Sequence, residues 1–167
     1  MQLRALLPLL GSRLRNRPGH LLSLTALVLP APAAVAAEPP AAVARATVVV
    51  HVTNLRSEKG QVLACLTFDA EHFPNCEHDP HAISLKRPAK TDMQLVFTGV
   101  PIGRYAIALI HDENANGKLD KALVIPREGF GFSRDAPVRM GPPSYDKAAF
   151  EVDAHCPAQT IRMRYLL

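Results

Sequence analysis

Hydrophobic and polar residues alternate with a period of two over much of the chain beyond its first quarter. In the first such segment Val48, Val50 and Val52 fall on one face, and Thr47 and His51 fall on the other. This alternation is typical of a β-strand that buries one of its two faces. The pattern predicts seven strands, at residues 46–53, 61–68, 83–85, 92–98, 104–110, 147–153 and 160–165.

The order of strands and turns predicts how they assemble. Residues 104–110 are apolar on both faces, so we expect this strand to be central. The turn at residues 57–60 predicts a hairpin between the first two strands, with Phe68 on the same apolar face as Leu66. Residues 126–133, rich in aromatic and Gly pairs, are expected to form an irregular loop folded onto the strands. With 15 Pro and no amphipathic helix, the fold class is all-β, a single antiparallel β-sandwich of about seven strands, Ig-like in type.

The amino terminus has the features of a secretory signal peptide. Four Arg residues precede the apolar residues 21–29, and small residues follow as far as Ala37. This order predicts cleavage after Ala36 or Ala37. An uncleaved membrane anchor is the alternative, although the apolar run is short for a span. The expected organisation is a signal peptide at 1–37, a tether at 38–45 and a β-sandwich domain at 46–167, in a periplasmic or secreted protein.

Removal of the signal peptide changes the charge of the protein. The chain has 19 Lys and Arg against 15 Asp and Glu, and four Arg but no acidic residue lie in residues 1–37. Subtracting those four leaves 15 basic and 15 acidic residues. A nearly neutral domain is not expected to bind nucleic acid or an acidic membrane. We therefore expect neither a nucleic-acid partner nor membrane insertion after signal cleavage.

An oxygen-rich loop at residues 112–120 follows the central strand. Counted from Asp112, oxygen-bearing side chains occupy positions one, three, five and nine, and a Gly occupies position six. This spacing matches most of a calcium loop, but Leu123 stands where such a loop has a bidentate Glu. Either Glu128 completes the shell, or water does, or no ion binds and the loop is a hydrogen-bonded turn. The expected ligands of Ca²⁺ are Asp112, Asn114, Asn116, the Lys118 carbonyl, Asp120 and Glu128.

Three Cys residues belong to the part of the chain expected to be exported. Cys65 lies on the polar face of its strand, and Cys76 lies in the loop that leaves that strand. Disulfides form in oxidising compartments, so we expect a Cys65–Cys76 disulfide. Cys156 is then free or pairs between chains. The alternative is that all three are small buried residues.

Two further groups of residues offer alternative functions. The loop at residues 71–81 holds His72, Cys76, His78 and His81, which are potential ligands of zinc or copper. Its spacing matches no recurrent zinc pattern, and a disulfide would consume the thiol. A hydrolase is a weaker alternative, with His111 beside Asp112 and Ser133 further along. The chain lacks the motifs that accompany such chemistry, so no catalytic residues are expected and the protein is predicted to be non-enzymatic.

Three stretches of sequence carry a family resemblance. Residues 97–105 (Phe-Thr-Gly-Val-Pro-Ile-Gly-Arg-Tyr) resemble the turn into a strand of transthyretin-like and carboxypeptidase-regulatory-like sandwiches, in which the Tyr packs into the core. Together with residues 111–120 and 126–133, they are similar to the DUF2141 family of exported bacterial proteins. The resemblance implies a fold and a compartment but no activity. By fold analogy the protein is expected to be a binding or accessory module for an envelope protein, a carbohydrate or a small ligand.

Overall fold

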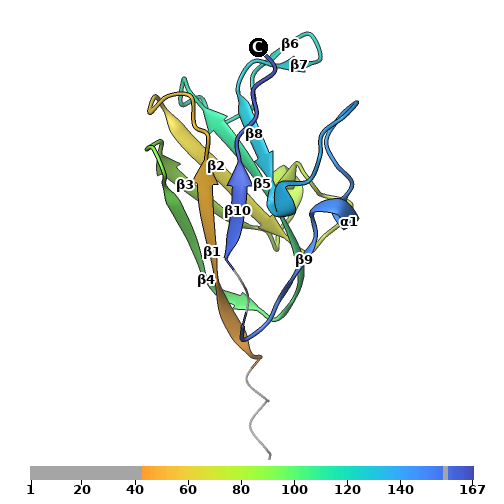
Figure 1. Cartoon of the computed structure of the whole chain (residues 1–167). Coiled ribbons are helices and arrows are strands. Elements are labelled where there is room, and N and C mark those ends of the chain that lie inside the picture. The colour runs from red at the N-terminus through yellow and green to blue at the C-terminus, as the bar shows by residue number, and fades with distance from the viewer. Residues whose placement is uncertain (1–42, 156–157) are drawn as a thin grey trace, which may run out of the picture. The chain divides into compact units, whose positions relative to one another are not determined.

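The computed structural model describes residues 43–155 and 158–167 (Figure 1). The expected signal peptide at 1–37 and residues 38–42 of the expected tether lie outside these ranges. The described residues form ten strands, one single-turn helix and two 3₁₀ turns. The strands are β1 (Arg45–Thr53), β2 (Gln61–Thr67), β3 (Ile83–Pro88), β4 (Gln94–Pro101), β5 (Gly103–Asp112), β6 (Lys121–Ala122), β7 (Ile125–Pro126), β8 (Gly129–Phe132), β9 (Phe150–Val152) and β10 (Gln159–Arg162). The helix α1 spans Tyr145–Ala148, and the 3₁₀ turns span Cys76–His78 and Ser133–Asp135.

The strands are arranged in two main sheets, which confirms the all-β sandwich. One sheet has the order β10-β1-β4, and the other has the order β3-β2-β5-β8 with β9 paired to β5. Strands β6 and β7 form a separate hairpin. Neighbouring strands are antiparallel except β1 and β10, which are parallel. No helix in the described part of the chain is long and apolar enough to cross a membrane.

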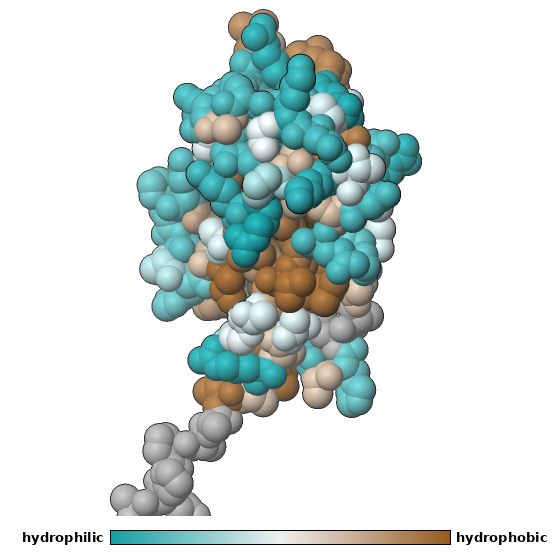
Figure 2. Space-filling view, turned by 90° about the vertical axis from the view of Figure 1, so that its left-hand side faces the viewer, coloured by the Kyte–Doolittle hydropathy of each residue, from teal (hydrophilic) through white to brown (hydrophobic). Residues whose placement is uncertain are grey.

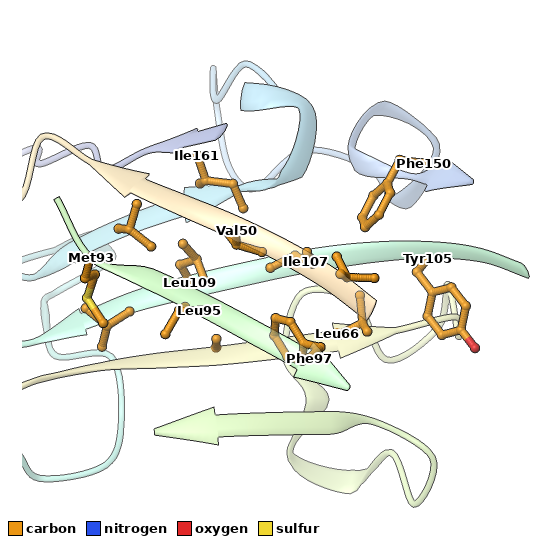
Figure 3. Packing of buried hydrophobic residues seen from close by; sticks show 14 of the residues in the cluster. Val50, Leu66, Met93, Leu95, Phe97, Tyr105, Ile107, Leu109, Phe150 and Ile161 are labelled. Carbon is orange, nitrogen blue, oxygen red and sulfur yellow. The ribbon is translucent and has the colours of Figure 1, made fainter. Parts of the chain in front are cut away.

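The core lies between the two sheets (Figure 3). The alternating residues of β1 are buried on one face, as predicted, and they meet Leu66 of β2 and Ile107 of β5 from the opposite sheet. Tyr105 also packs into this core, as the resemblance implied. Burying an aliphatic side chain of this size contributes about 1.5–3 kcal/mol. The apolar face of each strand is therefore the main reason that the two sheets pack together.

Strand β5 is central, as its sequence predicted. It pairs with β2 on one side and with β8 and β9 on the other. Ile107 and Leu109 face the main core, whereas Ala106 and Ala108 face a second apolar cluster on the outer side of the sheet. The members of this second cluster are Ala106, Ala108, Phe130, Phe132, Ala136 and Ala148, with Phe73, Val138 and Tyr145 packed against them. Both faces of β5 are thus covered, which explains its continuous apolar sequence.

The predicted hairpin between the first two strands is wrong. Strand β1 pairs with β4 and β10, while β2 lies in the other sheet, so residues 54–60 cross from one sheet to the other. Two strands that each have one apolar face can pack face to face across a core as well as edge to edge, and the sequence does not distinguish these arrangements. Phe68 was also misplaced: β2 ends at Thr67, and the Phe68 side chain is 51% exposed.

The segment predicted to be an irregular loop contains strand β8. Its Gly and Phe residues alternate, and the two Phe side chains enter the second apolar cluster. A Cβ at Gly129 would lie 2.4 Å from the Tyr165 ring, and a Cβ at Gly131 would lie 2.7 Å from Ile161 Cγ2. The glycines therefore leave room for the carboxy-terminal segment to lie directly against β8. A strand with Gly on one face lacks the hydrophobic alternation that identifies strands in a sequence.

The structure contains the predicted Cys65–Cys76 disulfide, with a Cα–Cα distance of 6.4 Å. It joins β2 to the 3₁₀ turn at Cys76–His78, so it fastens the long connection between β2 and β3 to the sheet. Cys156 lies outside the described residues.

Candidate functional site

Asp112 ends the central strand and organises the loop that follows. Its side chain is fully buried, and Oδ1 accepts a hydrogen bond of 3.0 Å from the Asn116 N–H. Oδ2 accepts one of 2.7 Å from the Gly117 N–H and one of 2.6 Å from Gln61 Nε2 on β2. The Asp112 carboxylate, at the first position of the loop, thus draws the backbone of Asn116 and Gly117 back towards the start of the loop, as in an Asx turn. The loop is consequently fixed to the end of the sheet.

Three of the predicted ligands converge at the outer part of the loop. The Asn114 and Asn116 amides donate to the Asp120 carboxylate at 2.7 and 3.0 Å. Their Oδ1 atoms accept the N–H groups of Asn116 and Lys118, both at 3.0 Å. The hydrogen bonds from Asn116 and then Asn114 hold the pKa of Asp120 below its ordinary value. Asp120 is therefore ionised near neutral pH with two amides in contact with it.

Glu128, the candidate to complete the ion's shell, reaches the loop at its base. Its side chain is buried, with Oε1 accepting the Glu113 N–H at 3.0 Å and Oε2 accepting the Asp120 N–H at 2.9 Å. Both carboxylate oxygens thus bridge the two ends of the loop. Lys118 is exposed and joins the loop through its N–H. Glu128 therefore fastens the base of the loop, while the converging side chains lie further out.

The arrangement of acidic side chains limits the kind of metal site that the loop can form. Among residues 43–155 and 158–167, no three His, Cys, Asp or Glu side chains are grouped so as to hold a metal ion. Asp112, Asp120 and Glu128 thus do not form such a group. A hard cation such as Ca²⁺ also accepts amide and backbone oxygens, so a site here needs the Asn114 and Asn116 oxygens as well as carboxylates.

Arg56 connects the loop to the carboxy-terminal segment. Its guanidinium donates to the Glu113 carboxylate and to the Leu167 and Arg127 carbonyls. The same group lies 4.5 Å from the centroid of the Tyr165 ring, a distance at which a cation is attracted to an aromatic face. Ser57 adds a hydrogen bond of 2.7 Å to Glu113 Oε1. These contacts, which come from the connection between β1 and β2, were not foreseen from the sequence.

Gly60 brings that same connection directly against the loop. Its φ is +67°, and a Cβ there would lie 2.1 Å from the Asp112 carbonyl oxygen. Gln61, Ser57 and Arg56 are 51 to 57 residues from the partners they contact in the loop. No local pattern could have identified them, because the crossing between sheets was not predictable.

His111 has a structural place beside the loop. It is fully buried, with Nε2 3.0 Å from the Lys59 carbonyl and Nδ1 2.8 Å from the Tyr165 hydroxyl. Since a carbonyl only accepts, Nε2 carries a proton and donates. In the neutral ring Nδ1 then accepts from the Tyr165 hydroxyl. His111 therefore links the turn before β2 to the carboxy-terminal segment.

Ser133, the other residue considered for a hydrolase, is also engaged in the fold. It is fully buried, and its Oγ donates to the Ala148 carbonyl at 2.6 Å. The same oxygen accepts the Ile107 N–H at 2.9 Å. These bonds tie the 3₁₀ turn and α1 to the central strand, and they give Ser133 a structural role.

The His/Cys-rich loop offers little to a soft metal. Cys76 is in the disulfide, so it has no thiolate to donate. His72 Nδ1 lies 2.8 Å from the Asp69 carboxylate, and this hydrogen bond holds the pKa of His72 above its ordinary value. Because metal binding requires a neutral His, the ion pair disfavours it. No observation in the described residues favours the zinc or copper alternative.

The Arg56–Glu113 pair leads to a prediction about acid stability. The hydrogen bond from Arg56 lowers the pKa of Glu113 from 4.5 to about 2. A lowered pKa in the folded state means that the stabilisation is complete above about pH 4.5 and is lost as the pH falls towards 2. We expect Glu113→Gln to reduce the free energy of unfolding at pH 6 by about 1 kcal/mol, since the pair is partly exposed to solvent.

Urea unfolding at pH 6 and at pH 2.5 measures this effect. The difference in unfolding free energy between wild type and Glu113→Gln should shrink at the lower pH, because the unfolded chain then carries a proton on Glu113 that folding must release. An equal difference at both values would show that the charge of Glu113 does not contribute. Glu151→Gln, a change at an exposed position on β9, is a control that should show no comparable pH dependence.

The fold and the loop together define an all-β sandwich protein with a hydrogen-bonded Asp/Asn loop at the end of its central strand. A family model described as "Uncharacterized protein conserved in bacteria (DUF2141)" matches residues 50–160. The chain belongs to the DUF2141 family, as its sequence motifs indicated. No curated protein and no solved structure matches it, so the likeness to transthyretin stays an expectation.

Proposed function

We propose that this protein is an exported, non-enzymatic accessory or binding module in which the loop at residues 112–120 binds Ca²⁺ as a structural ion. Its partner is an envelope protein, a carbohydrate or a small ligand. The observation that carries the calcium proposal is that the Asn114 and Asn116 amides both contact the Asp120 carboxylate, at 2.7–3.0 Å. The loop is thereby already folded around an acidic side chain, with two amide-bearing residues in contact with it.

The charges around the loop support a cation. Glu113 is paired with Arg56. Asp112 and Glu128 are buried, and the hydrogen bonds to their carboxylates come from backbone N–H groups and the Gln61 amide, which carry no net charge. Buried carboxylates are costly to keep ionised unless they are well compensated. A divalent cation close to them would lower that cost.

The hydrogen bonds leave oxygen lone pairs for such an ion. An amide oxygen has two lone pairs, and the Oδ1 atoms of Asn114 and Asn116 each accept one backbone N–H. The two amide groups donate hydrogen bonds to the Asp120 carboxylate from the side where a cation could bind instead. On binding, Ca²⁺ would replace them as the partner of Asp120, and Glu128 would keep the base of the loop closed.

The affinity of such a site should be low. Few carboxylates can reach the ion, and calcium affinity depends on the number of charged ligands and on the rigidity of the site. We expect a dissociation constant on the order of 10⁻⁴ to 10⁻³ M, as in extracellular modules. A site of this strength is useful only where calcium is abundant. The Cys65–Cys76 disulfide likewise suits an oxidising compartment outside the cytoplasm, which supports export to the periplasm or beyond.

Isothermal titration calorimetry of residues 38–167 with CaCl₂ tests the proposal. Wild type should bind Ca²⁺ with a dissociation constant of about 10⁻⁴ to 10⁻³ M, and Asp120→Asn should lose at least about tenfold in affinity because a ligand charge is removed. Asp92→Asn is the matched control. Asp92 is exposed, lies outside the loop and has φ +53°, which Asn tolerates. Absence of binding, or equal binding by wild type and Asp120→Asn, would contradict the proposal.

A further inference from the structure

The hairpin formed by β6 and β7 carries an exposed apolar tip. Leu123 is 97% exposed, Val124 86% and Ile125 43%, although all three are aliphatic. We call Leu123, Val124 and Ile125 the apolar tip. Figure 1 places the hairpin at the same end of the domain as the carboxy terminus, and Figure 2 shows hydrophobic atoms projecting at this end. These side chains contribute nothing to either apolar core, so their hydrophobic character needs another physical reason.

The chemistry of the turn does not explain the apolar tip. Leu123 has φ +55°, in the left-handed region. Short hairpin turns with such a residue strongly favour Gly, Asn or Asp, because a bulky side chain is disfavoured there. Leu is therefore a poor choice for the backbone and a poor choice for contact with water. Insertion of Leu123 into an apolar environment would explain why Leu stands here despite its unfavourable backbone conformation and its exposure.

The hairpin also has a basic residue on each side of the apolar tip in sequence. Lys121 and Arg127 flank it, both are exposed, and no acidic residue lies between them. Two acidic residues adjoin the hairpin in sequence: Asp120 contacts two Asn amides and is also attracted to Arg127, and Glu128 accepts two backbone N–H groups. Aliphatic residues at a tip with basic residues on either side match the boundary between the acyl chains and the anionic headgroups of a bilayer.

We propose that the apolar tip docks into the surface of a membrane that contains anionic phospholipid, with Lys121 and Arg127 contacting the phosphates. A lipid surface fits better than a protein partner. Three side chains on a narrow two-stranded hairpin form a small convex surface, whereas a stable protein interface buries about 800 Å² on each partner. The nearly neutral net charge argued against a membrane partner for the domain as a whole. The hairpin concentrates apolar and basic residues at one end, and docking there requires no membrane span.

Sedimentation with lipid vesicles tests this inference on residues 38–167, which hold every described strand and both apolar cores. The experiment is done in chelator, so its outcome does not depend on the calcium proposal. Wild type should bind vesicles of phosphatidylethanolamine and phosphatidylglycerol, bind phosphatidylcholine vesicles more weakly, and lose binding as salt screens the headgroups.

A double variant, Leu123→Asn with Val124→Ser, separates hydrophobicity from folding. Asn tolerates a positive φ, so this variant should fold at least as well as wild type. Its partition into anionic vesicles should fall at least about tenfold, because two aliphatic side chains no longer enter the lipid. Met140→Ser is the matched control, since Met140 is also fully exposed but lies outside the hairpin. It should bind as wild type does.

A fluorescent reporter shows whether the tip itself enters the lipid. The chain has no Trp, so Leu123→Trp introduces a single emitting group at the tip. Its emission should shift to shorter wavelength when anionic vesicles are added. Absence of vesicle binding by wild type, unchanged binding by the double variant, or unchanged Trp emission on bound vesicles would each overturn the proposal. Capture of a protein without vesicle binding, lost in the double variant, would also overturn it and assign the tip to a protein interface.

Discussion

Replacing Gly60 with Ala should lower the free energy of unfolding by about 2–5 kcal/mol, the sum of left-handed strain and overpacking. Gly60 has φ +67°, which disfavours any residue with a Cβ. The new Cβ would also lie 2.1 Å from the Asp112 carbonyl oxygen and 2.7 Å from the Glu113 carbonyl carbon. Both are backbone atoms and cannot move aside as a flexible side chain would. The connection between the sheets would have to separate from the loop.

Gly99→Ala provides the matched control. Gly99 has the same φ of +67°, but nothing lies within 4 Å of the position that its Cβ would take. This variant should therefore show only the left-handed strain, about 1–2 kcal/mol. Urea unfolding of both variants separates the two contributions. Equal destabilisation would show that the contact between residue 60 and the loop is not tight, and would contradict the packing described for this site.

Removal of the Cys65–Cys76 disulfide should have the second large effect. It closes a loop with a sequence separation of 11 residues. In the chain-entropy model such a closure contributes about 3 kcal/mol, because it restricts the unfolded chain. For a domain of this size we expect Cys65→Ala with Cys76→Ala to lower the melting temperature by roughly 10 °C.

Thermal unfolding should be compared in a Cys156→Ser background, so that no third thiol can exchange with the pair. Oxidised protein in this background should unfold at the higher temperature, and both the reduced protein and the double Ala variant should unfold at the lower one. If reduction left the melting temperature unchanged, the pair would contribute nothing to stability, and the support that it lends to an oxidising compartment would be lost.

The strands were predictable where one face or both faces of the chain are apolar. Val48, Val50 and Val52 specify one buried face, and the continuous apolar sequence of β5 specifies burial on both. Strand β8 was missed because Gly129 and Gly131 occupy the face that packs against the carboxy-terminal segment. These glycines matter because they have no side chain, and a hydrophobic pattern does not reveal such a requirement. The hairpin error has a related cause, since alternation identifies a strand but not its neighbours.

The candidate site was predictable only as far as it is local. The spacing of oxygen-bearing residues predicted one loop, and the structure has hydrogen bonds within it that involve Asp112, Asn114, Asn116 and Asp120. The contacts of Gln61, Arg56 and Tyr165 depend on which sheet each segment joins. Glu128 was identified as a partner of the loop, but its two backbone hydrogen bonds could not be read from spacing.

The loop and the hairpin are physically connected. Asp120 directly precedes Lys121 at the start of β6, and the Asp120 carbonyl accepts the Arg127 N–H at 2.9 Å just beyond β7. Arg56 joins Arg127 to Glu113 and to the carboxy-terminal segment. An ion bound at Asp120, as proposed, would therefore also order the base of the hairpin. In this arrangement a structural calcium ion would hold the apolar tip in a fixed position relative to the sandwich.

The most direct test of the calcium proposal is thermal unfolding of residues 38–167 in chelator and in ~10 mM CaCl₂, about ten times or more the expected dissociation constant. An ion that binds only the folded state with that constant stabilises it by about 1.4–2.7 kcal/mol, which raises the melting temperature by roughly 5–10 °C. We predict this rise for wild type and Asp92→Asn, a rise at most about half as large for Asp120→Asn, whose affinity is at least about tenfold lower, and none in NaCl of equal ionic strength. Identical melting temperatures of wild type with calcium and with chelator would contradict the proposal and leave the loop as a hydrogen-bonded turn.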